Sequence, residues 1–336
     1  MPIADIIVPC YRYGRFLERC VASVLAQGVA DLRILIIDDA SPDGSGAVAR
    51  EIAARDPRIR AVVHDANRGH IATYNEGIAW AEARYMLLLS ADDMLAPGAL
   101  KRAIEVMEEN SSVVLTYGGW TEVGPRDDVS VLKAFADAGD DWYLHSGAAL
   151  IEKTCRTAIN PVVTVTAIQR TAAQKTVGLY DPALTHSGDM EMWLRLGTIG
   201  DVAETRAIQG LRGMHGEKMS LVATDLLLRD YLQRELAFTS FFARTGRALA
   251  GADRLKRLAL RQLAEQAFWT GMAQYWRGDR AEGRDILRFA VRLNPRFVFA
   301  PPLGQLLRKG GPARRLGPVL KRFIPMPALP ARSRGA

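Results

Sequence analysis

The chain has 336 residues, of which 49% are hydrophobic and 24% are charged. This composition supplies one large core with a smaller additional element, and it excludes a chain that is disordered throughout. The sequence has no apolar run long enough to span a membrane and no signal-peptide pattern, so we expect a soluble cytoplasmic protein. Cys10, Cys20 and Cys155 lack C-x-x-C spacing, which predicts buried free thiols in a reducing compartment.

Apolar strand patterns alternate with amphipathic helix patterns over the first third of the chain. We expect strands at residues 5–8, 33–37, 61–64, 85–89 and 113–117. The helices between them are expected at residues 16–27, 45–55, 71–83 and 97–109. Helices at this spacing connect the strands of a parallel sheet, so the sequence predicts a doubly wound, mostly parallel α/β domain.

Polar segments follow four of the predicted strands. In doubly wound sheets, ligands bind outside the carboxyl ends of the strands. The sequence therefore predicts a cleft formed by residues 9–11, 38–43, 67–70 and 90–93.

The segment Gly44-Ser45-Gly46-Ala47-Val48-Ala49 fits the G-x-G-x-x-A pattern of dinucleotide-binding sites, and Asp65 follows near the expected distance. In such a site the glycines follow the strand directly. Here residues 38–43 intervene and bring three carboxylates to the place that a pyrophosphate would occupy. We therefore do not predict an NAD-type site.

The apolar run at residues 85–89 ends in Ser90-Ala91-Asp92-Asp93. Adjacent carboxylates repel each other and lose hydration on burial, so they are favoured in water or beside a cation. Magnesium and manganese prefer carboxylate oxygens. The alternative is that Asp92 or Asp93 caps the helix that begins near Pro97.

Together these motifs resemble the family 2 glycosyltransferases, which have the GT-A fold, and the resemblance extends over about residues 3–220. It implies transfer of a sugar, with inversion, from a nucleotide-diphosphate donor to an acceptor hydroxyl, assisted by a divalent metal, Mn²⁺ or Mg²⁺. The run from Ile6 to Tyr11 is similar to the family's opening strand and Pro-x-Tyr turn. By that resemblance Pro9 and Tyr11 border the nucleotide base; the alternative is that Tyr11 belongs to the core. Arg12 stands where the family mostly has Asn.

Three further segments carry the donor side of the resemblance. Asp38-Asp39-Ala40-Ser41-Pro42-Asp43 is similar to the family's Asp-Asp-x-Ser-x-Asp stretch, which implies that Asp39 accepts a hydrogen bond from the base. In Asn67-Arg68-Gly69, Arg68 either approaches the diphosphate or points into solvent. Ser90-Ala91-Asp92-Asp93 resembles the Asp-x-Asp-Asp metal motif with its first carboxylate replaced by serine. Asp92 would then contact the ribose or sugar, and Asp93 would coordinate the metal.

Two later segments resemble the acceptor side and the end of the family's catalytic domain. In Thr185-His186-Ser187-Gly188-Asp189-Met190-Glu191-Met192-Trp193, Asp189 holds the general-base position and Gly188 replaces a glutamate. Glu191 and Trp193 are then acceptor residues; the alternatives are that Asp189 caps a helix and that Trp193 lies in the core. The segment Arg212 to Ser220 implies that His215 reaches the metal or the diphosphate. The alternative for His215 is a solvated side chain.

Beyond residue 220 the pattern becomes helical, with helices expected at residues 226–248, 254–275 and 281–293. The last pair resembles one tetratricopeptide-like hairpin. One copy cannot form a solenoid, so it is interpreted as a helical cap, with partner binding as the alternative. The expected domains are thus a catalytic domain at residues 1–220, a helical appendage at 221–300 and a tail at 301–336.

The tail carries eight lysines and arginines and no acidic residue, and it accounts for the formal net charge of +7. It is either a disordered, solvated segment or a surface that lies on an anionic membrane, which would suit a lipid-linked acceptor and a peripheral position at the inner face of the membrane. Nucleic-acid binding is not expected. The replacements at Ser90 and Gly188 leave one rival hypothesis, a non-catalytic nucleotide-sugar-binding or scaffold protein.

Overall fold

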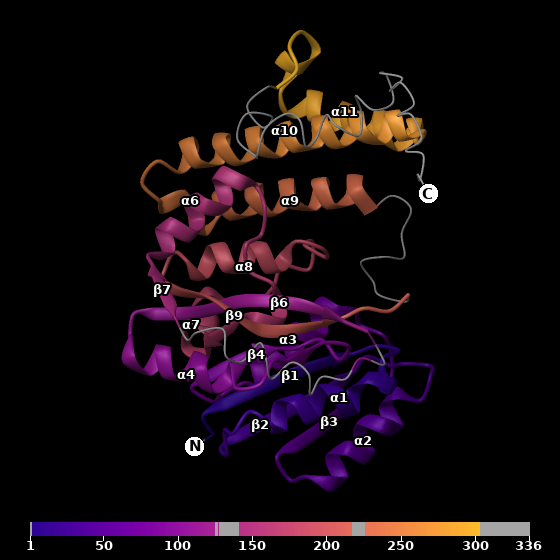
Figure 1. Ribbon diagram of the computed structural model, residues 1–336, viewed down its shortest axis with the longest axis vertical. Coiled ribbons are helices and arrows are strands. Elements are labelled where there is room, and N and C mark those ends of the chain that lie inside the picture. Colours follow the sequence, from indigo (N-terminus) through magenta and orange to yellow (C-terminus); the bar gives the residue numbers. More distant parts are fainter. Residues whose placement is uncertain (1, 125–126, 128–140, 217–225, 303–336) are drawn as a thin grey trace, which may run out of the picture. The chain divides into compact units, whose positions relative to one another are not determined.

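The computed structural model describes residues 2–124, 127, 141–216 and 226–302. The chain forms two compact units, which divide between Leu260 and Arg261. The first unit contains the sheet and the helices that cover it (Figure 1). The division falls within helix α10 (Ala252–Arg277).

Four parallel strands form the first half of the sheet, in the order β3-β2-β1-β4. They are β1 (Ala4–Cys10), β2 (Leu32–Asp38), β3 (Ile59–Val63) and β4 (Tyr85–Leu88). The connecting helices are α1 (Gly14–Leu25), α2 (Ser45–Arg55) and α3 (His70–Trp80). The predicted doubly wound α/β arrangement is confirmed over this part of the chain.

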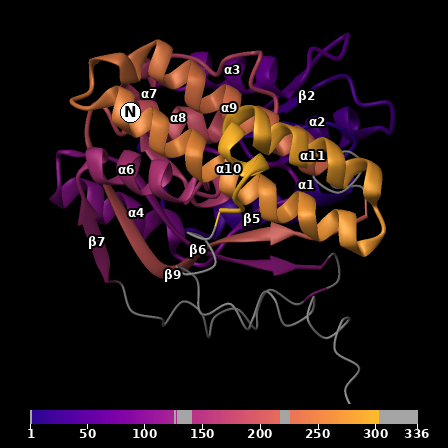
Figure 2. The same ribbon diagram turned by 90° about the horizontal axis from the view of Figure 1, so that it is seen from above.

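The second half of the sheet is mixed rather than parallel. Its strands are β5 (Met94–Leu95), β6 (Val113–Val123), β7 (Trp142–His145), β8 (Ile168–Arg170) and β9 (Asp201–Gly213). Strand β8 pairs antiparallel with β4 and β6, and β9 runs parallel to β6 but antiparallel to β5 and β7. The long strands β6 and β9 run side by side (Figure 2). Helix α4 (Ala99–Glu109) leads into β6.

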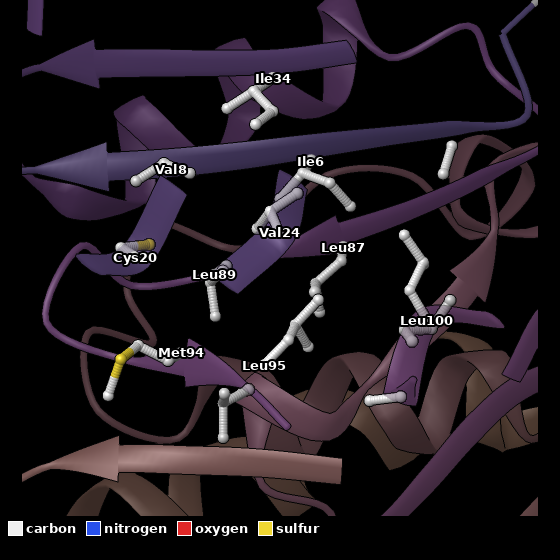
Figure 3. Packing of buried hydrophobic residues seen from close by; sticks show 14 of the residues in the cluster. Ile6, Val8, Cys20, Val24, Ile34, Leu87, Leu89, Met94, Leu95 and Leu100 are labelled. Carbon is white, nitrogen blue, oxygen red and sulfur yellow. The ribbon is translucent and has the colours of Figure 1, made fainter. Parts of the chain in front are cut away.

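Side chains on the two faces of β1 enter two different cores, since successive strand residues point to opposite sides. Ile6 and Val8 pack with Val24 of α1 and with Ile34 of β2 (Figure 3). Ile7 packs in the other core, which includes Trp193. Burial on both faces explains why the strand reads as a continuous apolar run.

The three cysteines are buried free thiols, as predicted. Burial raises the pKa of Cys10 and of Cys155 to about 12, so both remain neutral at physiological pH. Cys20 lies in the core beside Val8 and Val24 (Figure 3).

Further helices complete the first unit. They are α6 (Gly147–Thr157), α7 (Thr171–Val177), α8 (Gly188–Leu196) and α9 (Leu226–Ala243). Helices α8 and α9 lie side by side (Figure 1). Because α9 packs on α8, the first unit extends to Leu260, whereas we expected a domain boundary near residue 220.

The second unit contains the end of α10, helix α11 (Arg280–Leu293) and a final 3₁₀ turn (Pro295–Val298). Asp279 begins α11, and its side chain accepts a hydrogen bond from the backbone N–H of Glu282. Among the described residues, no helix combines the length and apolarity required to cross a bilayer. Nearly all of the predicted tail, with its eight cations, lies outside the described residues, as does Ser220.

Candidate active site

The carboxyl end of β1 lies between the loops that follow β2 and β4. Strand β1 pairs in parallel with both neighbours. Beyond the ladder, the N–H of Asp39 donates to the carbonyl of Cys10 at 2.9 Å, and that of Ala91 donates to the carbonyl of Pro9 at 3.3 Å. Strand pairing therefore brings the predicted segments after β1, β2 and β4 to one edge of the sheet.

Tyr11 follows β1 and is 43% exposed, so its ring is open to a ligand and the core alternative is wrong. The next residue, Arg12, has φ 62°, in the left-handed region that Asn adopts far more readily than most residues. This conformation accounts for the Asn that stands here in the family that the sequence resembles. The N–H of Arg12 donates to Ser41 Oγ at 2.8 Å, which joins this turn to the loop after β2.

The carboxylate of Asp39 accepts three hydrogen bonds. The backbone N–H groups of Arg68 and Gly69 each donate at 2.8 Å, and Nδ1 of His64 lies 2.8 Å from Oδ1. Burial alone would raise the pKa of Asp39, but these donors outweigh it and hold the pKa below its ordinary value. Asp39 is therefore a fixed anion that ties the end of β2 to the start of α3.

His64 connects Asp39 with a second carboxylate, and the sequence motifs do not predict this connection. Its Nε2 lies 2.9 Å from Glu76 Oε2, so the ring bridges the carboxylates of Asp39 and Glu76. The side chain of Arg68 lies beside the same carboxylate, 3.5 Å from Glu76 Oε2, and is 58% exposed. A histidine at the end of β3, opposite the Asp pair that ends β2, was the only sequence signal for this bridge.

Asp92, Asp93 and His215 line one small cavity of about 10 Å³, together with Phe16 and Arg19 among other residues. Ser90 Oγ donates to Asp92 Oδ1 at 2.5 Å, and His215 Nε2 lies 3.1 Å from Asp92 Oδ2. Asp93 Oδ1 accepts from the N–H of Gly213 at 3.0 Å. The pair does not cap α4, because Gly98 holds that position.

The donor set at this cavity fits a divalent cation that shares its ligands with a substrate. Within the described ranges, no group of three or more His, Cys, Asp or Glu side chains is arranged to hold a metal by itself. Two carboxylates nevertheless line a space of ion size, and the buried Nδ1 of His215 has no hydrogen-bond partner among the described residues. Magnesium and manganese are commonly bound by one or two carboxylates plus substrate phosphates. This set suits that mode.

Asp189 lies in the first turn of α8 and does not cap it, since the helix begins at Gly188 after Ser187. Asn160 Nδ2 and Thr164 Oγ1 donate to its Oδ2 at 3.0 and 3.4 Å. The side chain is partly buried, and this burial raises its pKa to about 6 in spite of these donors. Asn160 and Thr164 were not identified from the sequence.

Tyr74 of α3 interacts electrostatically with Asp189 and with the Asp92–Asp93 pair. Burial raises the pKa of its phenol, and the charges of Asp189, Asp93 and Asp92 raise it further, so all three carboxylates act on this one side chain. Its ring contacts that of His70, with centroids 5.5 Å apart, and His70 is in turn within electrostatic reach of Asp39. The predicted acidic residues therefore all interact electrostatically with this pair of rings on α3.

We correct two predicted acceptor residues. Trp193 is 2% exposed and belongs to the core that contains Ile7, so its ring is not available to an acceptor. Glu191 is also 2% exposed, and its Oε2 accepts a hydrogen bond from Arg195 Nε at 2.9 Å. Arg195 donates in turn to the carbonyls of Val177 and Leu179, so this pair supports the segment that precedes α8.

Residues 5–154 match the family model described as glycosyl transferase family 2. Over these residues, just under half of the chain, the protein is similar to the family 2 glycosyltransferases. An uncharacterized glycosyltransferase of Bacillus subtilis, EpsJ, is 35% identical over 126 residues, which cover 38% of this chain and 36% of the relative. A chondroitin synthase of Escherichia coli is 25% identical over 233 residues, which cover 69% of this chain and 32% of the relative. The chain thus spans about a third of the length of both relatives.

Solved structures share the fold of this chain. TarS residues 1–349 of S. aureus, in complex with UDP-GlcNAc, superpose with a TM-score of 0.64 at 15% identity, covering 91% of this chain and 85% of that chain. The mannosyltransferase PcManGT of Pyrobaculum calidifontis, in complex with GDP-Man and Mn²⁺, gives a TM-score of 0.53 at 16% identity, covering 96% and 80%. The predicted GT-A fold is confirmed.

Proposed function

We propose that this protein is a family 2 glycosyltransferase, which moves a sugar from a nucleotide-diphosphate donor to an acceptor hydroxyl with inversion at the anomeric carbon. One observation carries the proposal: the loops that hold Asp39 and the Asp92–Asp93 pair meet at one edge of the sheet, and Asp189, with a pKa of about 6, interacts electrostatically with the same side chain, Tyr74, as that pair. The TarS and PcManGT structures contain UDP-GlcNAc and GDP-Man, which supports a nucleotide-sugar donor.

The base of the donor binds at Pro9, Tyr11 and Asp39 in this proposal. An ionised carboxylate offers about four acceptor positions, and three N–H donors already orient that of Asp39. A remaining position accepts an N–H from the base edge, while the exposed ring of Tyr11 stacks on the base. Arg68, with a largely exposed guanidinium, approaches the diphosphate.

Asp93 would hold the divalent metal together with the donor phosphates, and His215 would support it from beside Asp92. When bound, such an ion offsets the negative charge on the departing diphosphate. Ser90, which replaces the first carboxylate of the motif, donates to Asp92 and orients it. In this proposal Asp92, held from both sides, contacts the ribose or the sugar.

Asp189 takes the proton from the acceptor hydroxyl as the hydroxyl oxygen attacks the anomeric carbon. A carboxylate with a pKa of about 6 is ionised at neutral pH and still close enough to that pH to act as an efficient base. Attack from the face opposite the leaving diphosphate inverts the configuration. The acceptor is a saccharide or a lipid-linked saccharide in this proposal, and the basic tail would hold the enzyme on an anionic membrane surface.

A non-catalytic nucleotide-sugar-binding protein is the second candidate, which Ser90 and Gly188 favour because both replace carboxylates of the motifs. The structure gives each residue a local reason. Ser90 bonds to Asp92, and a Cβ on Gly188 would lie only 3.2 Å from the ring of Tyr180. Release of free sugar from a panel of nucleotide sugars, measured with manganese and without acceptor, tests the choice. Slow hydrolysis supports the enzyme, and saturable binding without hydrolysis supports the alternative.

A further inference from the structure

One face of α3 presents two polar atoms without hydrogen-bond partners in the described part of the chain. His70 and Tyr74 are four residues apart and therefore share a helix face, and their rings meet edge to face. His70 Nε2 donates to the carbonyl of Thr185 at 2.9 Å, since a carbonyl can only accept. In the neutral imidazole this leaves a lone pair on Nδ1. Neither that nitrogen nor the hydroxyl of Tyr74 is bonded to another described residue.

The start of α3 lies beside both ends of the site. The N–H of Gly69 donates to Asp39 at 2.8 Å, and a Cβ on Gly188, next to Asp189, would lie 3.8 Å from Ile71. Burial lowers the pKa of His70, which keeps its ring neutral, and the nearby charge of Asp39 acts in the opposite direction. At the other end, the phenol of Tyr74 is under the influence of Asp189 and of the Asp92–Asp93 pair. A donor with its base at Asp39 and its anomeric carbon near Asp189 would therefore extend along His70 and Tyr74.

Packing holds Tyr74 in place. Its ring contacts the ring of Tyr180 edge to face, with centroids 5.6 Å apart. The neighbouring Asn75 accepts from the N–H of Tyr180 at 2.8 Å and donates to its carbonyl at 3.0 Å. The hydroxyl of Tyr74 is thus presented by a fixed ring, and a hydrogen bond to it costs little ordering entropy.

We propose that the hydroxyl of Tyr74 and Nδ1 of His70 hydrogen-bond the hydroxyl groups of the donor sugar and select which sugar is accepted. This inference rests on the proposed function. Neighbouring hydroxyls of a sugar both donate and accept hydrogen bonds. The hydroxyl of Tyr74 can also do both, and Nδ1 of His70 can accept. A nucleotide sugar that lacks the matching hydroxyl would leave a half-buried polar atom of the protein without a hydrogen bond. The free-energy cost of that unpaired atom is the usual source of strong selectivity between polar substrates.

Binding to Tyr74→Phe tests the inference, because this change removes one hydroxyl and keeps the ring contacts. Dissociation constants of the full chain with Mn²⁺ are measured for UDP and UDP-GlcNAc, and for GDP and GDP-mannose. We expect the affinity for the preferred nucleotide sugar, relative to its nucleoside diphosphate, to fall on the order of 3- to 10-fold. Affinity for the diphosphate itself should not change.

Tyr85→Phe is the matched control. Its hydroxyl bonds to Glu108 and it lies at the amino end of β4, at the opposite end of that strand from Asp92. If the wild-type protein binds neither diphosphates nor nucleotide sugars, the proposed function itself fails. If the wild type binds both but Tyr74→Phe keeps the wild-type ratio, or loses affinity for the diphosphate equally, only the role of Tyr74 in sugar selection is overturned.

Discussion

His215 Nε2 and Asp92 Oδ2 lie 3.1 Å apart, although 123 residues separate them in the chain. The rings of Tyr13 and Phe16 pack on the imidazole, with centroids 5.1 and 4.6 Å from its own. The contact joins the segment after β9 to the segment after β4. It therefore fixes the orientation of Asp92 beside the proposed metal ligand Asp93.

His215→Ala should raise the Mn²⁺ concentration needed for half-maximal donor hydrolysis about 10- to 100-fold, the usual effect of removing a residue that supports a metal site. Titration of hydrolysis with Mn²⁺ gives this value. His145→Ala is the matched control, because His145 lies on β7 and its side chain is 42% exposed. An unchanged Mn²⁺ requirement in His215→Ala would contradict a role for His215 at the metal.

Asp189→Asn should lower the rate of sugar transfer on the order of a hundred- to ten-thousandfold, because the amide cannot take the proton of the acceptor hydroxyl. Nucleotide affinity should stay at the wild-type value, since Asp189 lies at the acceptor end of the site. Transfer rates and calorimetric binding of the nucleoside diphosphate measure the two effects. The control is Asp56→Asn at the end of α2, where the carboxylate pairs with Arg58. Near-normal transfer by Asp189→Asn would refute the assignment.

Asp189 should also make stability depend on pH. Its pKa is about 6 in the folded protein and close to 3.8 in the unfolded chain, so between these values the folded state holds the proton more tightly. Stability conferred by the protonated form is therefore present below about pH 3.8 and is lost as the pH rises to about 6. Up to about 3 kcal/mol is lost, since each pKa unit corresponds to about 1.4 kcal/mol.

Urea unfolding of the wild type and of Asp189→Asn at pH 4 and pH 7 measures this loss. Because the asparagine side chain does not titrate, the change with pH in the stability difference between the two proteins reports the titration of Asp189. We expect the variant to gain about 2 to 3 kcal/mol relative to the wild type on going from pH 4 to pH 7. A difference independent of pH would show that Asp189 has an ordinary pKa.

Asp39→Asn should weaken binding of the nucleoside diphosphate about tenfold or more, because the base loses a charge-assisted hydrogen bond. Asp43→Asn in the same loop is the control. The carboxylate of Asp43 accepts from the N–H and hydroxyl of Ser45 at the start of α2, so this change should affect that helix start and leave nucleotide affinity unaltered. Equal losses in both variants would show that the loop, rather than the Asp39 carboxylate, determines binding.

The first half of the fold was predictable because its strands are buried on both faces and are separated by helices with clear apolar spacing. Helix α2 begins and ends where the sequence predicts, at Ser45 and Arg55. The later strands β5 and β8 have two and three residues, which is too short for any periodic pattern. Their antiparallel pairing, and hence the mixed sheet, was therefore beyond prediction from spacing.

In the candidate site, too, contacts within one helix were predictable, whereas contacts between segments far apart in the chain were not. Helical spacing places Glu191 and Arg195 on one face of α8, and they form an ion pair. Spacing does not reveal that neighbouring elements bury that face and Trp193 with it. Glu191 and Trp193 were therefore predicted to contact an acceptor. The partners of Asp189, Asn160 and Thr164, lie in a segment without regular spacing, where only the folded chain identifies them.

The bridge from Asp39 through His64 to Glu76 has a consequence for the choice of donor. Glu76 lies on α3, the helix that also carries His70 and Tyr74. A single rigid helix thus anchors the base-reading carboxylate and presents the proposed sugar-reading atoms, which fixes the spacing between them. We expect the preference for the base and the preference for the sugar to vary together among related enzymes. A nucleotide-sugar donor with one phosphate instead of two should be too short to contact both the base-reading carboxylate and the sugar-reading atoms.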